Sequence, residues 1–191
     1  MRILCFGDSN TYGYDSRTGS DGRYPGEARW VDLLARMTGW TVQNRGENGR
    51  QIPRTPHTLA QAQRMLRANR SADLVVVMLG TNDLLQGATA SDTAARMERF
   101  LTEIKPLCCR ILLIAPPPMA FGQWVTEEAL IRTSAQLGAA YAAAAANVGV
   151  DFADAASWNV ALCYDGVHFS ESGNNSFAQG LHGHLQTMGF R

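Results

Sequence analysis

Two short, continuously apolar runs constrain the fold of this chain more than any other feature. They read LVVVML at 74–79 and ILLIA at 111–115. Apolar runs of this length without polar alternation are typical of strands that are buried on both faces of a parallel sheet. We therefore expect a sheet that is covered by helices on each side.

Weaker strand candidates and amphipathic helical segments alternate around these two runs. The further strands are predicted at 2–6, 41–44 and 150–153, and the helices at 30–37, 58–69, 91–104, 126–147 and 170–188. Gly39 and Gly149 are expected to end two helices, and Ser91 to begin one. The alternation predicts an α/β fold: a three-layer α/β/α sandwich around a five-stranded parallel sheet, flavodoxin-like, in the order 2-1-3-4-5.

Length and composition favour one ordinary globular domain. The 191 residues have no internal repeat and no Ser/Gly linker, so residues 1–191 are predicted to form a single domain. Lys and Arg together number 17, as do Asp and Glu, so charge favours neither a nucleic acid nor a membrane as partner. The start MRILCFGDSN does not resemble a signal peptide, which makes the cytoplasm the expected location.

Polar motifs follow three of the predicted strands. GDSN at 7–10 follows the first, GTND at 80–83 follows the third, and DGVH at 165–168 follows the fifth. Ligand sites in open α/β sheets lie outside the carboxyl ends of the strands, at the point where the strand order reverses. The first two motifs are therefore expected to face one crevice.

These motifs supply the parts of a nucleophilic hydrolase. A serine hydroxyl needs a base to remove its proton, and the base needs a carboxylate to orient it. Of the four histidines, His168 alone has an aspartate, Asp165, three residues before it, and Ser9 is the serine that both would serve. We predict that Ser9 is the nucleophile, His168 the base and Asp165 its orienting partner.

A tetrahedral intermediate also needs hydrogen-bond donors for its oxyanion. The candidates are the backbone N–H of Ser9, the backbone N–H of Gly49 and the side-chain amide of Asn82, with Gly46 as the competitor of Gly49. Glycine suits a position where the backbone must approach a ligand closely.

The order GDS, a glycine after the second strand, GTND and D-x-x-H resembles the four blocks of the SGNH (GDSL-like) hydrolase family. The resemblance spans nearly the whole chain, and VVVMLGTNDL and DGVHFS are most similar to the bacterial arylesterase and acyltransferase branch. It implies the same triad of Ser9, Asp165 and His168, and an oxyanion hole of Ser9, Gly49 and Asn82. Relatives in this family are often oligomers, so the resemblance also implies a homo-oligomer.

Further side chains are candidates for substrate contact or for organising loops. Asn10, Phe121 and Trp124 are predicted to contact the substrate, although packing against a helix or a second subunit is a competing interpretation for the last two. Asp8 and Asp83 are interpreted as loop-organising hydrogen-bond acceptors rather than metal ligands. No metal and no cofactor is predicted. Arg50 and Arg54 are expected to be surface charges.

The resulting prediction is a serine esterase that hydrolyses small-molecule esters with short acyl chains or aryl groups through an acyl-enzyme, with acyl transfer to alcohols as a further activity. A carbohydrate O-acetyl esterase is the alternative within the same chemistry. A non-catalytic α/β binding domain is the alternative from another class.

Overall fold

The computed structural model describes residues 1–19 and 22–191, and its centre is a five-stranded parallel sheet in the order β2-β1-β3-β4-β5. The strands are β1 (Arg2–Gly7), β2 (Thr41–Gly46), β3 (Leu74–Met78), β4 (Ile111–Ala115) and β5 (Asp151–Asp154). All neighbouring pairs are parallel, which confirms the predicted fold class and strand order.

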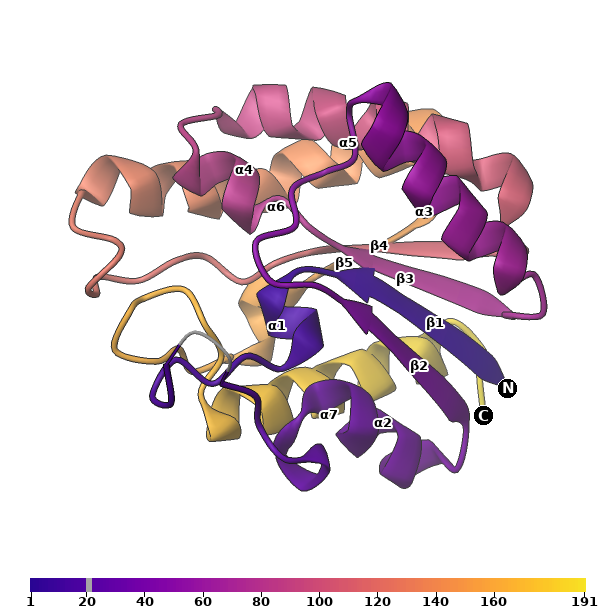
Figure 1. Ribbon diagram of the computed structural model, residues 1–191, viewed down its shortest axis with the longest axis horizontal. Helices are drawn as coiled ribbons and strands as arrows, with labels where there is room; N and C mark the ends of the chain where they lie inside the picture. The colour runs from indigo at the N-terminus through magenta and orange to yellow at the C-terminus, as the bar shows by residue number, and fades with distance from the viewer. Residues whose placement is uncertain (20–21) are drawn as a thin grey trace.

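Helices cover both faces of this sheet (Figure 1). They are α1 (Ser9–Tyr12), α2 (Trp30–Thr38), α3 (Pro56–Ala68), α4 (Thr81–Leu85), α5 (Ala90–Ile104), α6 (Glu128–Val148) and α7 (Glu171–Thr187). Helices α3, α4, α5 and α6 lie on one side, and α2 and α7 lie on the other. The architecture is therefore the predicted three-layer sandwich.

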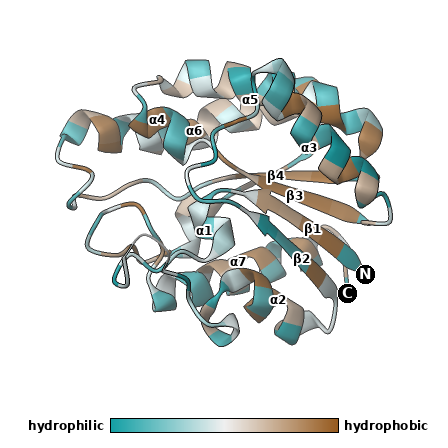
Figure 2. Ribbon diagram, in the orientation of Figure 1, coloured by the Kyte–Doolittle hydropathy of each residue, from teal (hydrophilic) through white to brown (hydrophobic). Residues whose placement is uncertain are grey.

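The central strands explain why their sequences are apolar without interruption. In β3, Val75 and Val77 point into the core beneath α5 and α6, whereas Val76 points into the core against α2 and α7. In β4, Leu113 likewise points toward α5 and α6, and Leu112 points toward α2 and α7. Figure 2 shows these strands as the most hydrophobic part of the ribbon. Burial of each such side chain contributes about 1.5–3 kcal/mol relative to its exposure.

Capping residues set the helix boundaries within two residues of the predicted ones. Helix α6 ends at Gly149, whose φ of 71° is the expected left-handed cap. Helix α5 begins earlier than predicted, because the hydroxyl of Thr89, not Ser91, accepts the N–H of Asp92. Ser170 caps α7 in the same way through the N–H of Gly173.

Two short helices that the sequence did not predict, α1 and α4, follow β1 and β3 directly. A glycine that the geometry requires precedes each of them: Gly80 is the N-cap of α4, and Gly7 ends β1 just before the Asp8 cap of α1. Gly80 has a φ of 121°, and a Cβ there would lie 2.4 Å from the hydroxyl of Tyr141. A Cβ on Gly7 would lie 2.0 Å from Oγ1 of Thr11. These sharp turns bring the motif side chains to the carboxyl edge of the sheet.

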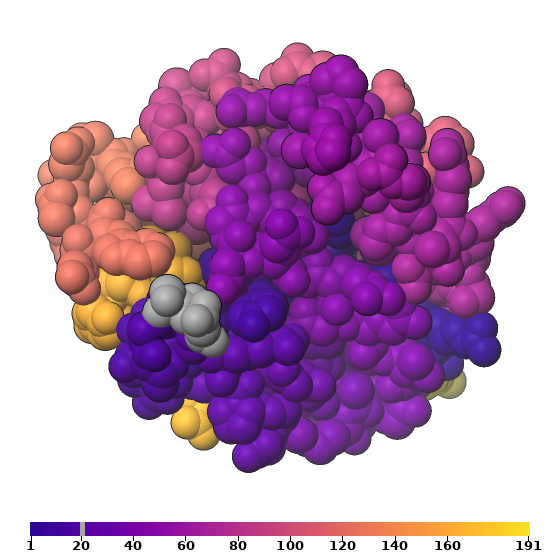
Figure 3. Space-filling model, in the orientation of Figure 1, coloured from indigo at the N-terminus to yellow at the C-terminus, as the bar shows by residue number. Residues whose placement is uncertain are grey.

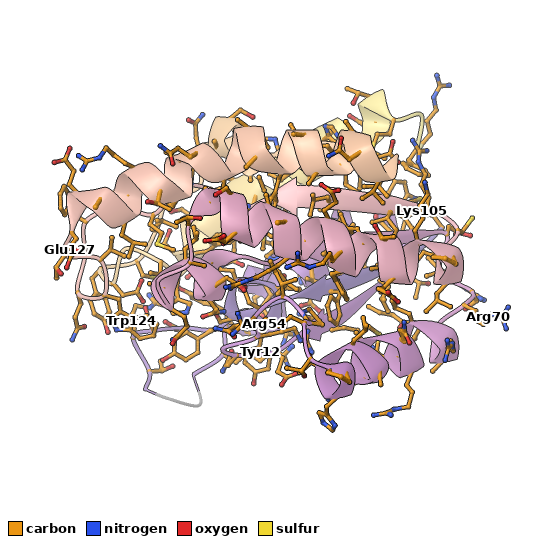
Figure 4. The ribbon with its side chains drawn as sticks, turned by 90° about the horizontal axis from the view of Figure 1, so that it is seen from above. Tyr12, Arg54, Arg70, Lys105, Trp124 and Glu127 are labelled. Atoms are coloured by element: carbon orange, nitrogen blue, oxygen red, sulfur yellow. The ribbon has the colours of Figure 1, made fainter. Side chains whose placement is uncertain are left out.

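The two ends of the sheet differ in what they carry. In Figure 4, Trp124 lies at the end to which the strands lead, and Arg70 and Lys105 lie at the opposite end.

Within residues 1–19 and 22–191, none of the helices combines the length and apolar character needed to cross a membrane.

Candidate active site

Three side chains from the two ends of the chain meet at the carboxyl edge of the sheet. Oγ of Ser9 lies 3.0 Å from Nε2 of His168, and Nδ1 of the same ring lies 2.8 Å from Oδ2 of Asp165. All three side chains are buried. Ser9 comes from the first residue of α1, and the other two from a loop that we name the histidine loop (residues 163–169).

The carboxylate of Asp165 is held as an anion by the turn it occupies. Its Oδ1 accepts the backbone N–H groups of Val167 and His168, both at 2.9 Å. Burial alone would raise the pKa of Asp165, but these bonds and the one from the His168 ring outweigh it and lower the pKa to about 2. The group is therefore ionised at neutral pH and can orient the imidazole.

A second segment, the glycine loop (residues 47–52), is fastened to β1 and α4. The amide Nδ2 of Asn82 donates to the backbone oxygen of Arg50 at 3.0 Å, and Oδ2 of Asp83 accepts the N–H of Ile52 at 2.9 Å. The N–H of Glu47 donates to the backbone oxygen of Gly7 at 3.2 Å. Asn82 and the glycine loop are thus adjacent at the end of β1.

Asp83 is fully buried and fits the predicted role of a loop-organising acceptor. Besides Ile52, its carboxylate pairs with Arg96 of α5 at 3.0 Å, so its charge is compensated. Asp8 behaves similarly at the start of α1, where its carboxylate accepts the N–H of Asn10 at 3.0 Å. In the described part of the chain, no group of three or more His, Cys, Asp or Glu side chains could hold a metal ion.

The two glycines considered as oxyanion donors have different surroundings. The N–H of Gly46 donates to Oδ1 of Asn44 at 2.9 Å, and Gly46 itself is the last residue of β2. Gly49 lies in the exposed turn of the glycine loop with a φ of 72°. Because the N–H of Gly46 already has an acceptor, Gly49 is the better candidate of the two.

Arg50 was expected to be a surface charge, and the structure corrects this. Its guanidinium donates to the backbone oxygens of Gly7, at 2.7 Å, and Arg45, pairs with Glu47, and stacks on the ring of Phe6 at 4.4 Å. Burial lowers the pKa of Arg50, yet the group keeps these acceptors. The sequence carries no signal for this, because the contacts depend on β1 and β2 lying side by side.

Asn10 was predicted to contact the substrate, and the structure gives it other partners. The residue is buried; its Nδ2 donates to the backbone oxygen of Val167 at 3.2 Å, and its Oδ1 accepts the N–H of Phe169 at 2.9 Å. Both ends of the amide are therefore occupied by the histidine loop. The short α1 helix, which the sequence did not predict, turns this side chain inward.

Aromatic rings flank the imidazole. The ring of Trp124 meets that of His168 edge-on at 4.9 Å, which places this predicted contact residue beside the base. Tyr14, which no sequence motif indicated, meets it from another element at 4.6 Å. Phe121 is 66% exposed and lies in the same segment as Trp124. Backbone bonds join this segment to the histidine loop, among them Trp124 N–H to the oxygen of Asp165 at 3.1 Å.

A cavity of about 390 Å³ lies behind the glycine loop, between that loop, β1 and α3. Phe6, Ile52, Ala62 and Met65 form its apolar part, and Gly49 and Arg50 of the glycine loop also line it. Figure 3 shows this face of the molecule, with indigo atoms of the N-terminal strand at the base of a hollow. Ser9, Asp165 and His168 are not among the residues that line this cavity.

The chain is similar to known proteins in sequence and in fold. Residues 5–175 match the model of the GDSL-like lipase/acylhydrolase family. The chain is similar to an M. smegmatis aryl esterase, at 27% identity and a TM-score of 0.85 with 97% of this chain and 98% of that one covered. It is also similar to a putative arylesterase from Agrobacterium tumefaciens, at 31% identity and a TM-score of 0.83 with 97% and 98% covered.

A carbohydrate acetylesterase from Sinorhizobium meliloti is similar as well, at 25% identity and a TM-score of 0.84 with 98% of this chain and 99% of that one covered. No curated protein sequence matches the chain.

Proposed function

This chain belongs to the GDSL-like lipase/acylhydrolase family and is a carboxylic ester hydrolase. We propose that Ser9, His168 and Asp165 are its catalytic triad. The observation that carries the proposal is the continuous line of hydrogen bonds from the hydroxyl through the imidazole to the carboxylate, at 3.0 and 2.8 Å. A hydroxyl, a base and an orienting group at these distances are the arrangement that nucleophilic catalysis requires.

In the proposed mechanism, the Asp165 carboxylate accepts a hydrogen bond from Nδ1–H of His168, which keeps the proton on Nδ1 and leaves Nε2 as the acceptor for the Ser9 hydroxyl. Nε2 takes that proton as Oγ attacks the ester carbonyl carbon, and the imidazolium then returns it to the departing alkoxide. The acyl-enzyme is released by a water molecule that the same imidazole deprotonates. An alcohol in place of water would give the predicted acyl transfer.

We assign the oxyanion hole to the backbone N–H groups of Ser9 and Gly49 and to the amide of Asn82. Ser9 is the first residue of α1, where backbone N–H groups have no acceptor within the helix. Asn82 uses one N–H for Arg50, and its amide has a second. Donors that are fixed before the reaction stabilise the developing charge most effectively.

The substrate proposed for this site is an ester with a short acyl chain and an aryl or alkyl leaving group. The exposed ring of Trp124 beside His168 suits contact with a flat leaving group. The apolar cavity is lined by the glycine loop, β1 and α3, and none of the three triad residues is part of its lining. A long acyl chain would therefore extend into water and forgo about 0.8 kcal/mol for each methylene left unburied.

An acetylated carbohydrate is the second candidate, because a similar structure is that of a carbohydrate acetylesterase. A panel of p-nitrophenyl and naphthyl esters of increasing acyl length, together with acetylated xylo-oligosaccharides, separates the two. Acetyl and butyryl aryl esters are expected to give the highest kcat/KM. A maximum at decanoyl or longer would contradict the short-chain proposal, and a preference for the oligosaccharide would favour the second candidate.

The triad is tested by Ser9→Ala together with a fluorophosphonate probe. The variant is expected to fold as the wild type and to lose about 10⁵-fold or more in kcat on p-nitrophenyl acetate. Peptide mapping of the labelled wild type should locate the phosphonyl group on Ser9. Labelling of another serine, or near-normal turnover by the variant, would assign the nucleophile elsewhere.

A further inference from the structure

The side-chain amide of Asn10 bonds to both peptide groups of His168. The oxygen of Val167 and the N–H of Phe169 belong to the two peptide bonds that flank the histidine, and they meet Nδ2 and Oδ1 of Asn10 at 3.2 and 2.9 Å. Asn10 is also the residue that follows Ser9. One side chain thus joins the backbone of the nucleophile to the backbone of the base.

The backbone of Asn10 is itself fixed by the core. The indole Nε1 of Trp30 donates to its carbonyl oxygen at 2.9 Å, and Trp30 is fully buried against Phe177, with ring centroids 4.8 Å apart. The N–H of Trp30 in turn donates to Oδ1 of Asn174 at 3.1 Å. The backbone of Asn10 is therefore attached, through Trp30, to the buried core formed by α2 and α7.

We propose that Asn10 is a positioning residue that sets the distance and orientation between Ser9 and His168. The inference rests on the proposed roles of these two residues. A primary amide is the group that can donate to a carbonyl and accept from an N–H at once, with both partners on one short segment. An apolar residue of the same size in place of Asn10 would leave the oxygen of Val167 and the N–H of Phe169 without this partner. A carboxylate in its place would put an oxygen against the oxygen of Val167.

The expected effect is on the chemical step. Small displacements of a base from its nucleophile lower the rate strongly, by about 100-fold for a shift of the order of 1 Å. Asn10→Leu is expected to lower kcat by about 10- to 100-fold with KM within about twofold. The rate of fluorophosphonate labelling of Ser9 should fall in the same proportion, since it depends on the same proton transfer.

Asn10→Asp provides a readout that loss of stability alone would not give. The aspartate keeps the acceptor for Phe169, and its buried carboxyl, with a raised pKa, can donate to Val167 only when protonated. The ratio of variant to wild-type kcat/KM should therefore rise as the pH falls from 8 to 6.

Asn174→Leu is the matched control. Asn174 is an asparagine equally buried in the same network, and its amide bonds to backbone groups of Trp30 and Ser170 rather than to the histidine loop. This variant is expected to have a lower Tm and a kcat within about twofold of wild type. Equal kcat losses in Asn174→Leu and Asn10→Leu would overturn the proposal, because the effect would then follow stability.

Two other outcomes would also contradict the positioning role of Asn10. A rise in KM without a change in kcat would make Asn10 a substrate contact. A ratio of Asn10→Asp to wild-type kcat/KM that is independent of pH would remove the role of the Asn10 donor. These results are distinguishable from a failure of the triad itself, since Ser9→Ala and the position of the phosphonyl group test the triad without reference to Asn10.

Discussion

The histidine loop and the glycine loop lie at the same edge of the sheet, but they are held by different kinds of group. The histidine loop is fixed by the amide of Asn10, by the carboxylate of its own Asp165, and by its backbone, in which the N–H of Cys163 donates to the oxygen of His168 at 2.7 Å. The glycine loop is fixed largely by charged groups, Arg50 and the Asp83–Arg96 pair.

This difference follows from what each loop must present. The histidine loop must orient a side chain whose protonation changes during the reaction, and the carboxylate of Asp165 is the charged group that contacts the ring directly. The glycine loop must present backbone N–H groups to a negative charge, and the cation of Arg50 near the site does not oppose that task. Substitutions in the two loops should therefore differ in the size and kind of their effects.

The largest effect is expected from Asp165→Asn, which acts on the histidine loop. The asparagine can no longer fix the tautomer of His168 or stabilise the imidazolium, so kcat should fall by about 10⁴-fold at pH 7 with a smaller change in KM. Steady-state kinetics on p-nitrophenyl acetate measure this.

Asp154→Asn is the control for that variant. Asp154 also accepts a backbone N–H two residues on, at Ala156, but it is the last residue of β5 and its carboxylate lies beside Gly138 of α6. Its kcat should stay within about twofold of wild type. A comparable loss in both variants would mean that the turn, and not the carboxylate beside His168, is responsible.

The next largest fall in kcat is expected from Asn82→Ala, which acts on the side of the glycine loop. It removes the proposed oxyanion donor and the bond to Arg50, and kcat should fall by about 10²–10³ with little change in KM. Asn82→Asp should be at least as damaging, since a carboxylate repels the oxyanion. An active Asn82→Asp enzyme would show that residue 82 does not donate to the intermediate.

Asp8 lies between the two loops and interacts electrostatically with both His168 and Arg50. Burial, its largest influence, raises the pKa of Asp8 from 3.8 to about 6. Folding therefore favours the protonated form, and the stability associated with it is present below about pH 4 and lost as the pH rises through 6.

Asp8→Asn should consequently stabilise the protein at pH 8, by up to about 3 kcal/mol, because asparagine can still accept the N–H of Asn10 without a buried charge. The gain in Tm should disappear near pH 4. Thermal unfolding of both proteins between pH 4 and 8 measures it. A gain that is the same at every pH would show that the ionisation of Asp8 is not the cause.

The smallest effect is expected from Arg50→Met, which keeps an apolar stem over Phe6 but removes the bonds to Gly7, Arg45 and Glu47. A less firmly held glycine loop should lower kcat about tenfold. Arg54→Met is the matched control, because Arg54 lies nearby on an exposed position with one long bond to Gln51. Equal kinetics for the two variants would contradict the proposed role of Arg50.

Local sequence determined most of the framework and the identity of the reacting groups. Continuous apolar runs require burial on both faces, so β3 and β4 and the layers around them could be predicted from residues 74–79 and 111–115 alone. His168 follows Asp165 by three positions, and one turn of chain is enough to join them. The pairing of these two residues could therefore be predicted from their spacing.

The surroundings of those groups could not be predicted in this way, because they arise between segments far apart in the chain. Asn10 meets residues 167 and 169, and Arg50 meets residues 7 and 45, only after the parallel strands have aligned. Sequence patterns report the periodicity of one element, whereas these contacts depend on the register between elements. The sequence by itself thus determined which groups can react, and the tertiary structure decided which backbone atoms hold them at reacting distance.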